Sequence, residues 1–107
     1  MKLINRIRKN NDFGVAINNG HATRLPSYLI FKRETDFGYT RVGLSVSKKL
    51  GGAVIRNRIK RQVRAMCQEL IDFNKLSLDI VIIVKQPFLK KTFDDNKSQL
   101  SDYTKGL

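Results

Sequence analysis

Residues 40–73 of the chain read TRVGLSVSKKLGGAVIRNRIKRQVRAMCQELIDF, and the hydrophobic period changes in the middle of this stretch. From Thr40 to Ser47 apolar and polar residues alternate, which is typical of a strand with one buried face. From about Gly52 to Phe73 apolar residues recur every three or four positions, which predicts a long amphipathic helix. The stretch therefore predicts a strand, a glycine-containing loop and a helix that packs on a sheet.

Further elements are predicted on both sides of this unit. A helix is expected from about Asn10 or Asn11 to Asn18, with an asparagine as its N-cap. Tyr28–Arg33 and Asp79–Val84 are rich in aromatic and β-branched residues and predict strands, the second at the centre of a sheet because it is almost uniformly apolar. Phe37-Gly38-Tyr39 predicts the turn of a hairpin between strands 28–33 and 40–47. A last helix is expected at about 92–103.

The composition fits one small, basic domain over residues 1–107. Twenty-one Lys and Arg stand against nine Asp and Glu, and the formal charge of +12 favours a polyanionic partner. The longest apolar run, 80–84, is far shorter than a membrane span. The single cysteine, Cys67, excludes an intrachain disulfide and is expected to be a buried small residue, whereas His21 is expected at the surface in a turn. We therefore expect a cytoplasmic binding protein without a membrane partner.

The positive charge is concentrated in one part of the chain. No acidic residue lies between Asp36 and Glu69. Guanidinium groups on a helix suit phosphate oxygens because they donate paired hydrogen bonds, whereas a merely solvated helix face usually mixes both signs of charge. This part of the chain is predicted to bind nucleic acid through Lys48, Lys49, Arg56, Asn57, Arg58, Lys60, Arg61 and Arg64.

No side-chain triad, carboxylate pair or metal-binding cluster is visible in the sequence. We therefore assign no catalytic residue and no metal ligand to the protein itself. Composition alone leaves open whether the chain belongs to an RNA-processing particle or is a small structural RNA-binding protein of the ribosomal type.

Residues 41–61 resemble the signature of the bacterial ribonuclease P protein family. The most specific parts are the run from Gly43 to Lys49 and the Arg56-Asn57-Arg58 core. The resemblance extends upstream from Asn5 to Gly20, and it also fits strand 79–83. Ile17 and Gly52 depart from the family pattern, which usually has an aromatic residue and an asparagine there. The length of the match favours this family over the ribosomal alternative.

The resemblance implies an α/β (α+β) two-layer sandwich. About four strands would pack on helices in the order α-β-β-β-α-β-α, with a β-α-β crossover of the rare left-handed kind. It also implies a protein subunit that binds the catalytic RNA of ribonuclease P and the 5′ leader of precursor tRNA, and that assists endonucleolytic removal of the leader. The RNA and its Mg²⁺ would perform the hydrolysis, so the family requires neither a cofactor bound by protein side chains nor a protein partner.

The resemblance assigns the predicted RNA-binding residues to the surface that faces the catalytic RNA. It also implies a leader groove between the first helix and the open face of the sheet, formed here by Phe13, Ile17, Phe31 and Ser45. The alternation of strand 40–47 gives that face Gly43, Ser45 and Ser47, whose small side chains would leave room for an extended nucleic-acid strand.

Overall fold

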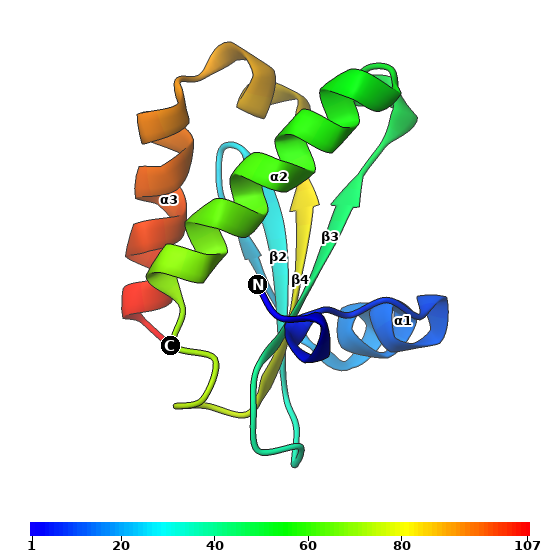
Figure 1. Ribbon diagram of the computed structural model, residues 1–107, viewed down its shortest axis with the longest axis vertical. Coiled ribbons are helices and arrows are strands. Elements are labelled where there is room, and N and C mark those ends of the chain that lie inside the picture. Colours follow the sequence, from blue (N-terminus) through cyan, green and yellow to red (C-terminus); the bar gives the residue numbers. More distant parts are fainter.

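The structure, a computed structural model, describes residues 1–107 and has the predicted order of elements (Figure 1). The helices and strands are α1 (Asn10–Asn19), β1 (His21–Arg24), β2 (Tyr28–Glu34), β3 (Arg41–Val46), α2 (Ala53–Leu70), β4 (Leu78–Val84) and α3 (Phe93–Lys105). Three short 3-10 turns accompany them: η1 (Leu3–Asn5), η2 (Lys48–Leu50) and η3 (Gln86–Lys90). The α+β class and the order α-β-β-β-α-β-α are confirmed.

The four strands form one mixed sheet in the order β1-β2-β4-β3. The central position predicted for residues 79–84 is confirmed, because β4 pairs antiparallel with β2 on one side and parallel with β3 on the other. The predicted hairpin between strands 28–33 and 40–47 is wrong. Six of the seven residues of β4 are buried, so this strand needs neighbours on both sides, and it separates β2 from β3.

The connection from β3 through α2 to β4 is left-handed, as the resemblance implies. In Figure 1 both strands point upward, β4 lies to the left of β3, and α2 crosses in front of the sheet. A right-handed crossover, which is the general rule, would place the second strand on the right in this view.

Helices cover both faces of the sheet and create two apolar clusters. The larger cluster lies between the sheet and the pair α2 and α3, and it includes Tyr28, Ile30 and Cys67, of which Cys67 was predicted to be buried. The smaller cluster consists of Ile7, Ala16 and Val81, and it lies under α1 on the opposite face. Because α1 contacts β2 and β4, it leaves part of this second face uncovered.

Several local predictions needed correction. The N-cap of α1 is Lys9, which makes no side-chain capping bond, and not an asparagine. The helix predicted to reach Phe73 ends at Leu70, because Ile71 is already extended; Phe73 is nevertheless buried, from the following loop. His21 is exposed as predicted, but it begins strand β1 and is not in a turn. None of the helices has both the length and the apolar character of a membrane span.

Candidate nucleic-acid interface

The loop between β3 and α2 has a fixed backbone and free lysine side chains. The Ser47 hydroxyl accepts a hydrogen bond from the Lys49 amide (3.1 Å), and the Gln86 side chain donates to the Lys49 carbonyl (3.0 Å). Leu50 anchors the loop in the core, whereas Lys48 and Lys49 are exposed. Gly51 adopts a φ of 146°, which side-chain-bearing residues rarely adopt. The loop therefore presents two cations from a defined backbone.

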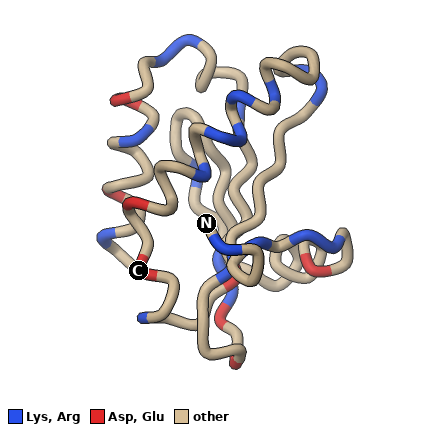
Figure 2. Tube along the Cα trace, viewed as in Figure 1, with Lys and Arg blue, Asp and Glu red and all other residues tan.

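Helix α2 continues this positive surface. Asn57, Arg58 and Arg61 are exposed, whereas Arg56, Lys60 and Arg64 follow one another at four-residue spacing along a half-buried flank. We call the last three the flank row. The structure thus brings all eight residues predicted to bind nucleic acid together on α2 and the loop before it. Figure 2 shows this run of blue segments; the one acidic residue of α2, Glu69, lies near the C-terminal end of the helix.

None of the cations in this group is neutralised by a carboxylate. The ion pairs of the chain involve Arg33, Arg41, Lys97 and Lys105. Arg56 donates one hydrogen bond from Nε to the carbonyl of Gly51 (3.2 Å), which stabilises the first turn of α2 without removing its charge. The surface therefore keeps its full positive charge for a partner.

Arg41, the first cation of the acid-free stretch, has a different role. Its Nε and Nη2 donate to the two carboxylate oxygens of Asp79 at 2.8 and 2.7 Å, and its Nη1 lies 3.4 Å from Oδ2 of Asp12. The guanidinium also lies over the ring of Phe37, 4.6 Å from its centroid. The hydrogen bonds to Asp79 raise the pKa of Arg41. This residue joins β3 to β4 and to α1, so its charge is used within the protein.

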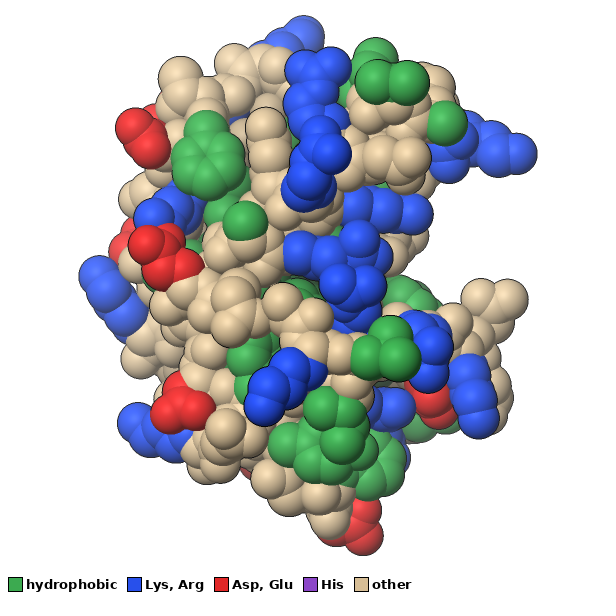
Figure 3. All heavy atoms as spheres, viewed as in Figure 1, with side chains coloured by type: hydrophobic (Ala, Val, Ile, Leu, Met, Phe, Trp, Pro, Cys, Tyr) green, Lys and Arg blue, Asp and Glu red, His purple; other side chains and the backbone are tan.

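The predicted groove residues lie on the face of the sheet that α1 partly covers. Phe13, Ile17 and Phe31 are half-buried and pack against the smaller cluster, and Ser45 is exposed. The aromatic rings therefore belong partly to the core and keep an accessible edge. In Figure 3 the molecule is hollowed between α1 and the end of β3, with Lys and Arg side chains along the inner wall of the hollow.

The predicted open face of β3 is only partly open. Gly43 is buried under Phe13, and a Cβ at this glycine would lie 2.7 Å from the ring. This close approach lets α1 pack directly on the sheet. Ser45 and Ser47 are exposed as expected. The partly exposed Leu29 and Ile83 lie in register with Ser45 and extend the groove floor. Neither was predicted from the sequence, because apolar neighbours in β2 and β4 give no alternation that marks an exposed position.

A second basic region was missed by the sequence analysis. A cavity of about 450 Å³ lies between the N-terminal segment, α1 and the start of β3. Four of its lining residues are cationic, against one acid: Arg6, Arg8, Lys9 and Arg41, with Asp12. The signal was present in the sequence, because residues 1–11 contain four basic residues and no acid.

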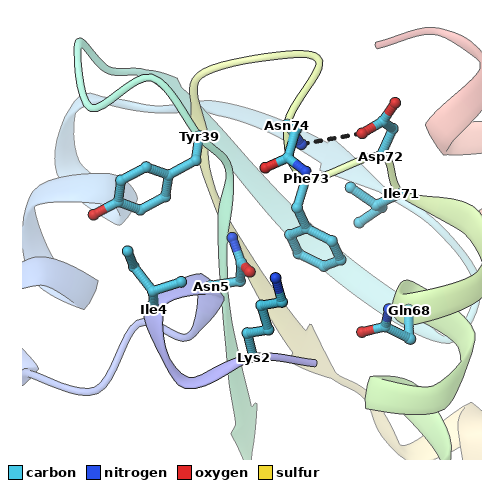
Figure 4. A pocket seen from close by; sticks show the side chains of 9 residues that line it. All are labelled: Lys2, Ile4, Asn5, Tyr39, Gln68, Ile71, Asp72, Phe73 and Asn74. Carbon is cyan, nitrogen blue, oxygen red and sulfur yellow. Dashed lines mark hydrogen bonds between the residues drawn. The ribbon is translucent and has the colours of Figure 1, made fainter.

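Another cavity, of about 310 Å³, lies between the N-terminal segment and the loop after α2 (Figure 4). Asn5 and Phe73 come from opposite sides of it, and the Asn5 amide donates to the carbonyl of Thr40 (2.8 Å). It contains none of the predicted site residues. No group of three His, Cys, Asp or Glu side chains is placed to hold a metal ion.

Comparison with known proteins agrees with the expected family and with the fold. The family model for ribonuclease P matches residues 1–107. The chain is 42% identical over 96 residues to the ribonuclease P protein component of Mesoplasma florum, covering 89% of this chain and 87% of that one. It is 39% identical over 101 residues to that of Bacillus mycoides, covering 94% and 88%.

Solved structures of ribonuclease P proteins share the fold. The Staphylococcus aureus protein superposes with a TM-score of 0.82 at 33% identity, covering 92% of this chain and 90% of that one. The Thermotoga maritima protein superposes with a TM-score of 0.82 at 26% identity, covering 95% and 96%. These matches decide between the two classes that composition left open. The chain belongs to the ribonuclease P protein family, the protein component of the endoribonuclease that processes the 5′ ends of tRNA.

Proposed function

We propose that this chain binds the catalytic RNA of ribonuclease P through α2 and the loop before it, and the 5′ leader of precursor tRNA in the groove beside α1. The observation that carries the proposal is the group of cations on α2 and its loop, none of which has a carboxylate partner. In a bacterial cell both RNAs are cytoplasmic, so we place the chain there.

The α2 surface suits the backbone of a folded RNA. Its arginines project from a helix that is anchored by buried Ile59, Val63 and Met66, so their positions are set before RNA binds. Guanidinium groups form paired hydrogen bonds with phosphate oxygens, and an amide such as Asn57 can pair with a base edge or a 2′-hydroxyl. Rigid phosphate contacts of this kind position a protein on RNA without reading its sequence.

The groove suits an extended single strand. Phe13 and Phe31 offer accessible ring edges, Ile17 adds apolar contact, and Ser45 leaves space at the floor. Aromatic side chains bind bases with little sequence preference, which fits leaders that differ between tRNAs. Because mature tRNA has no leader, contacts here would raise the affinity for precursor alone.

We assign phosphodiester hydrolysis, and the Mg²⁺ that supports it, to the RNA subunit. Mg²⁺ prefers oxygen ligands, usually carboxylates and phosphates. The interface of this chain presents guanidinium and ammonium groups, so its donor set does not fit a protein-held Mg²⁺. No other protein is needed for this arrangement.

The decisive experiment is reconstitution with the cognate catalytic RNA. We expect the chain to increase the affinity of the RNA for precursor tRNA over mature tRNA, and the chain alone not to cleave precursor. Equal affinity for both tRNAs would contradict the leader-binding role, and cleavage by the RNA-free chain would contradict the assignment of hydrolysis to RNA.

A further inference from the structure

Arg6 is a half-buried cation that the chain leaves without a carboxylate partner. It follows η1, where its backbone pairs with Val42 of β3, and the next residue donates from its amide to the Val42 carbonyl (3.0 Å). Its Nε is buried and has no hydrogen-bond partner. Buried donors are almost always satisfied, so an orphaned guanidinium nitrogen indicates a bound group.

The side chain of Arg6 lies on the α2 side of the sheet. Paired residues on adjacent strands point to the same face, and Val42 packs in the larger cluster beneath α2. Ile7, the next residue, points the other way and packs under α1. Arg6 therefore lies beside the C-terminal end of the flank row, where Arg64 is.

Arg64 is close enough for the two charges to interact. Burial lowers the pKa of Arg64, and the positive charge of Arg6 lowers it further. Neither arginine takes part in an ion pair. Arg41, which is also half-buried, is instead held by two carboxylates. The chain thus neutralises Arg41 with carboxylates and leaves Arg6 and Arg64, whose charges interact, without a carboxylate partner.

We propose that Arg6 and Arg64 together bind one phosphate group of RNA, at the end of the flank row. A water molecule could satisfy the orphaned nitrogen but would leave both charges uncompensated, whereas a phosphate oxygen pair accepts from both guanidinium groups. The site would link the N-terminal segment to the α2 surface, and it rests on the proposed function, which supplies the RNA. The phosphate could belong to the catalytic RNA or to precursor tRNA.

The test uses Arg6→Gln, Arg64→Gln and the double variant, with Lys75→Gln as the control. Lys75 is an exposed cation in the loop after α2, so its replacement changes the net charge equally. The affinity of each protein for catalytic RNA is measured over a range of salt concentrations, and the affinity of each reconstituted holoenzyme for precursor tRNA is measured in parallel. Thermal unfolding of each free protein is followed without RNA.

We expect each single variant to weaken RNA binding by about 10- to 100-fold. Because both side chains serve the same phosphate, the double variant should lose little more, and the salt slope should fall by about one in total. Loss of affinity for catalytic RNA assigns the phosphate to that RNA; loss confined to precursor assigns it to the substrate. The free variants should unfold at the same or a higher temperature, because a like-charge contact is removed.

Three results would overturn this site. Additive losses with a slope change of about two would show two separate phosphate contacts. Lower unfolding temperatures that parallel the affinity losses would show a structural role. Variants that match Lys75→Gln in both binding assays would show no contact. Failure of the unmodified chain to bind catalytic RNA in a salt-dependent way would instead refute the proposed function itself.

Discussion

Replacement of Asp79 by asparagine is expected to destabilise the protein strongly while leaving its shape almost unchanged. Asp79 is completely buried and accepts two short hydrogen bonds from Arg41, and a nitrogen of Arg33 lies 3.6 Å away. Asparagine keeps the size of the side chain but removes the charge and one acceptor. Removal of one member of a buried ion pair typically costs about 3–5 kcal/mol, and here Arg41 would keep only Asp12, at 3.4 Å, as a carboxylate partner.

This loss should be visible as a shift in thermal unfolding. For a chain of 107 residues the entropy of unfolding is about 0.22 kcal/mol per kelvin, so the unfolding temperature should fall by about 13–22 °C. Calorimetry of the two proteins measures the shift. The matched control is Asp36→Asn, which makes the same chemical change at an exposed acid and should alter the stability by about 0.5 kcal/mol or less.

A double-mutant cycle tests whether the pair itself is responsible. The combined Arg41→Met and Asp79→Leu variant removes both charges and fills the space with apolar side chains, so it should be clearly more stable than the sum of the single effects predicts. Additive losses, or a cost of under about 1 kcal/mol for Asp79→Asn, would refute the view that this ion pair anchors β3 to β4.

The other predictions concern the interface and the core. Replacement of Arg58 and Arg61 by glutamine should weaken binding to catalytic RNA and lower its salt slope by about one per lost phosphate contact; an unchanged slope in a salt titration would contradict their phosphate roles. Phe31→Ala should weaken binding of precursor tRNA by roughly 1–3 kcal/mol and leave binding of mature tRNA unchanged, whereas equal losses in the two binding assays would indicate a purely structural ring. Burial raises the pKa of Cys67 from 9.0 to about 12. Its contribution to stability is therefore complete below about pH 9 and declines by up to about 1.4 kcal/mol per pH unit as the pH rises toward 12. Denaturant unfolding at pH 8, 9 and 10 should show a flatter decline for Cys67→Ala, and parallel curves would contradict this cause.

Local pattern was sufficient for most elements of this fold. The period of α2 and the alternation of β3 follow directly from side-chain spacing, and the apolar sequence of β4 indicates a central strand. The order of the strands in the sheet could not be predicted from local pattern. A short turn at Phe37–Tyr39 suggested a hairpin between β2 and β3, whereas β4 lies between these strands in the sheet. The central position predicted for β4 already implied the correct strand order. A central strand needs two neighbours, and only β2 and β3 are long enough to pair along β4.

The ion pairing of the basic residues could not be predicted from local sequence either. A run of basic residues predicted where RNA would bind, but it could not show which cations are already paired. Arg41 and Asp79 are 38 positions apart and meet only because β3 and β4 are adjacent. Likewise, Arg6 comes near Arg64 only because the N-terminal segment lies beside β3. Such contacts depend on topology, and no local sequence pattern encodes them.

The position of β4 has a consequence for synthesis of the chain on the ribosome. Residues 78–84 are among the last third to be translated, yet they form the middle of the sheet. Until they emerge, β2 can pair only with β1, and β3 has no neighbouring strand at all. At about 5–20 residues per second, the nascent chain spends several seconds with these edges and most of its apolar surface open. The sheet therefore cannot assemble stepwise from the N-terminus, and its completion awaits nearly the whole polypeptide.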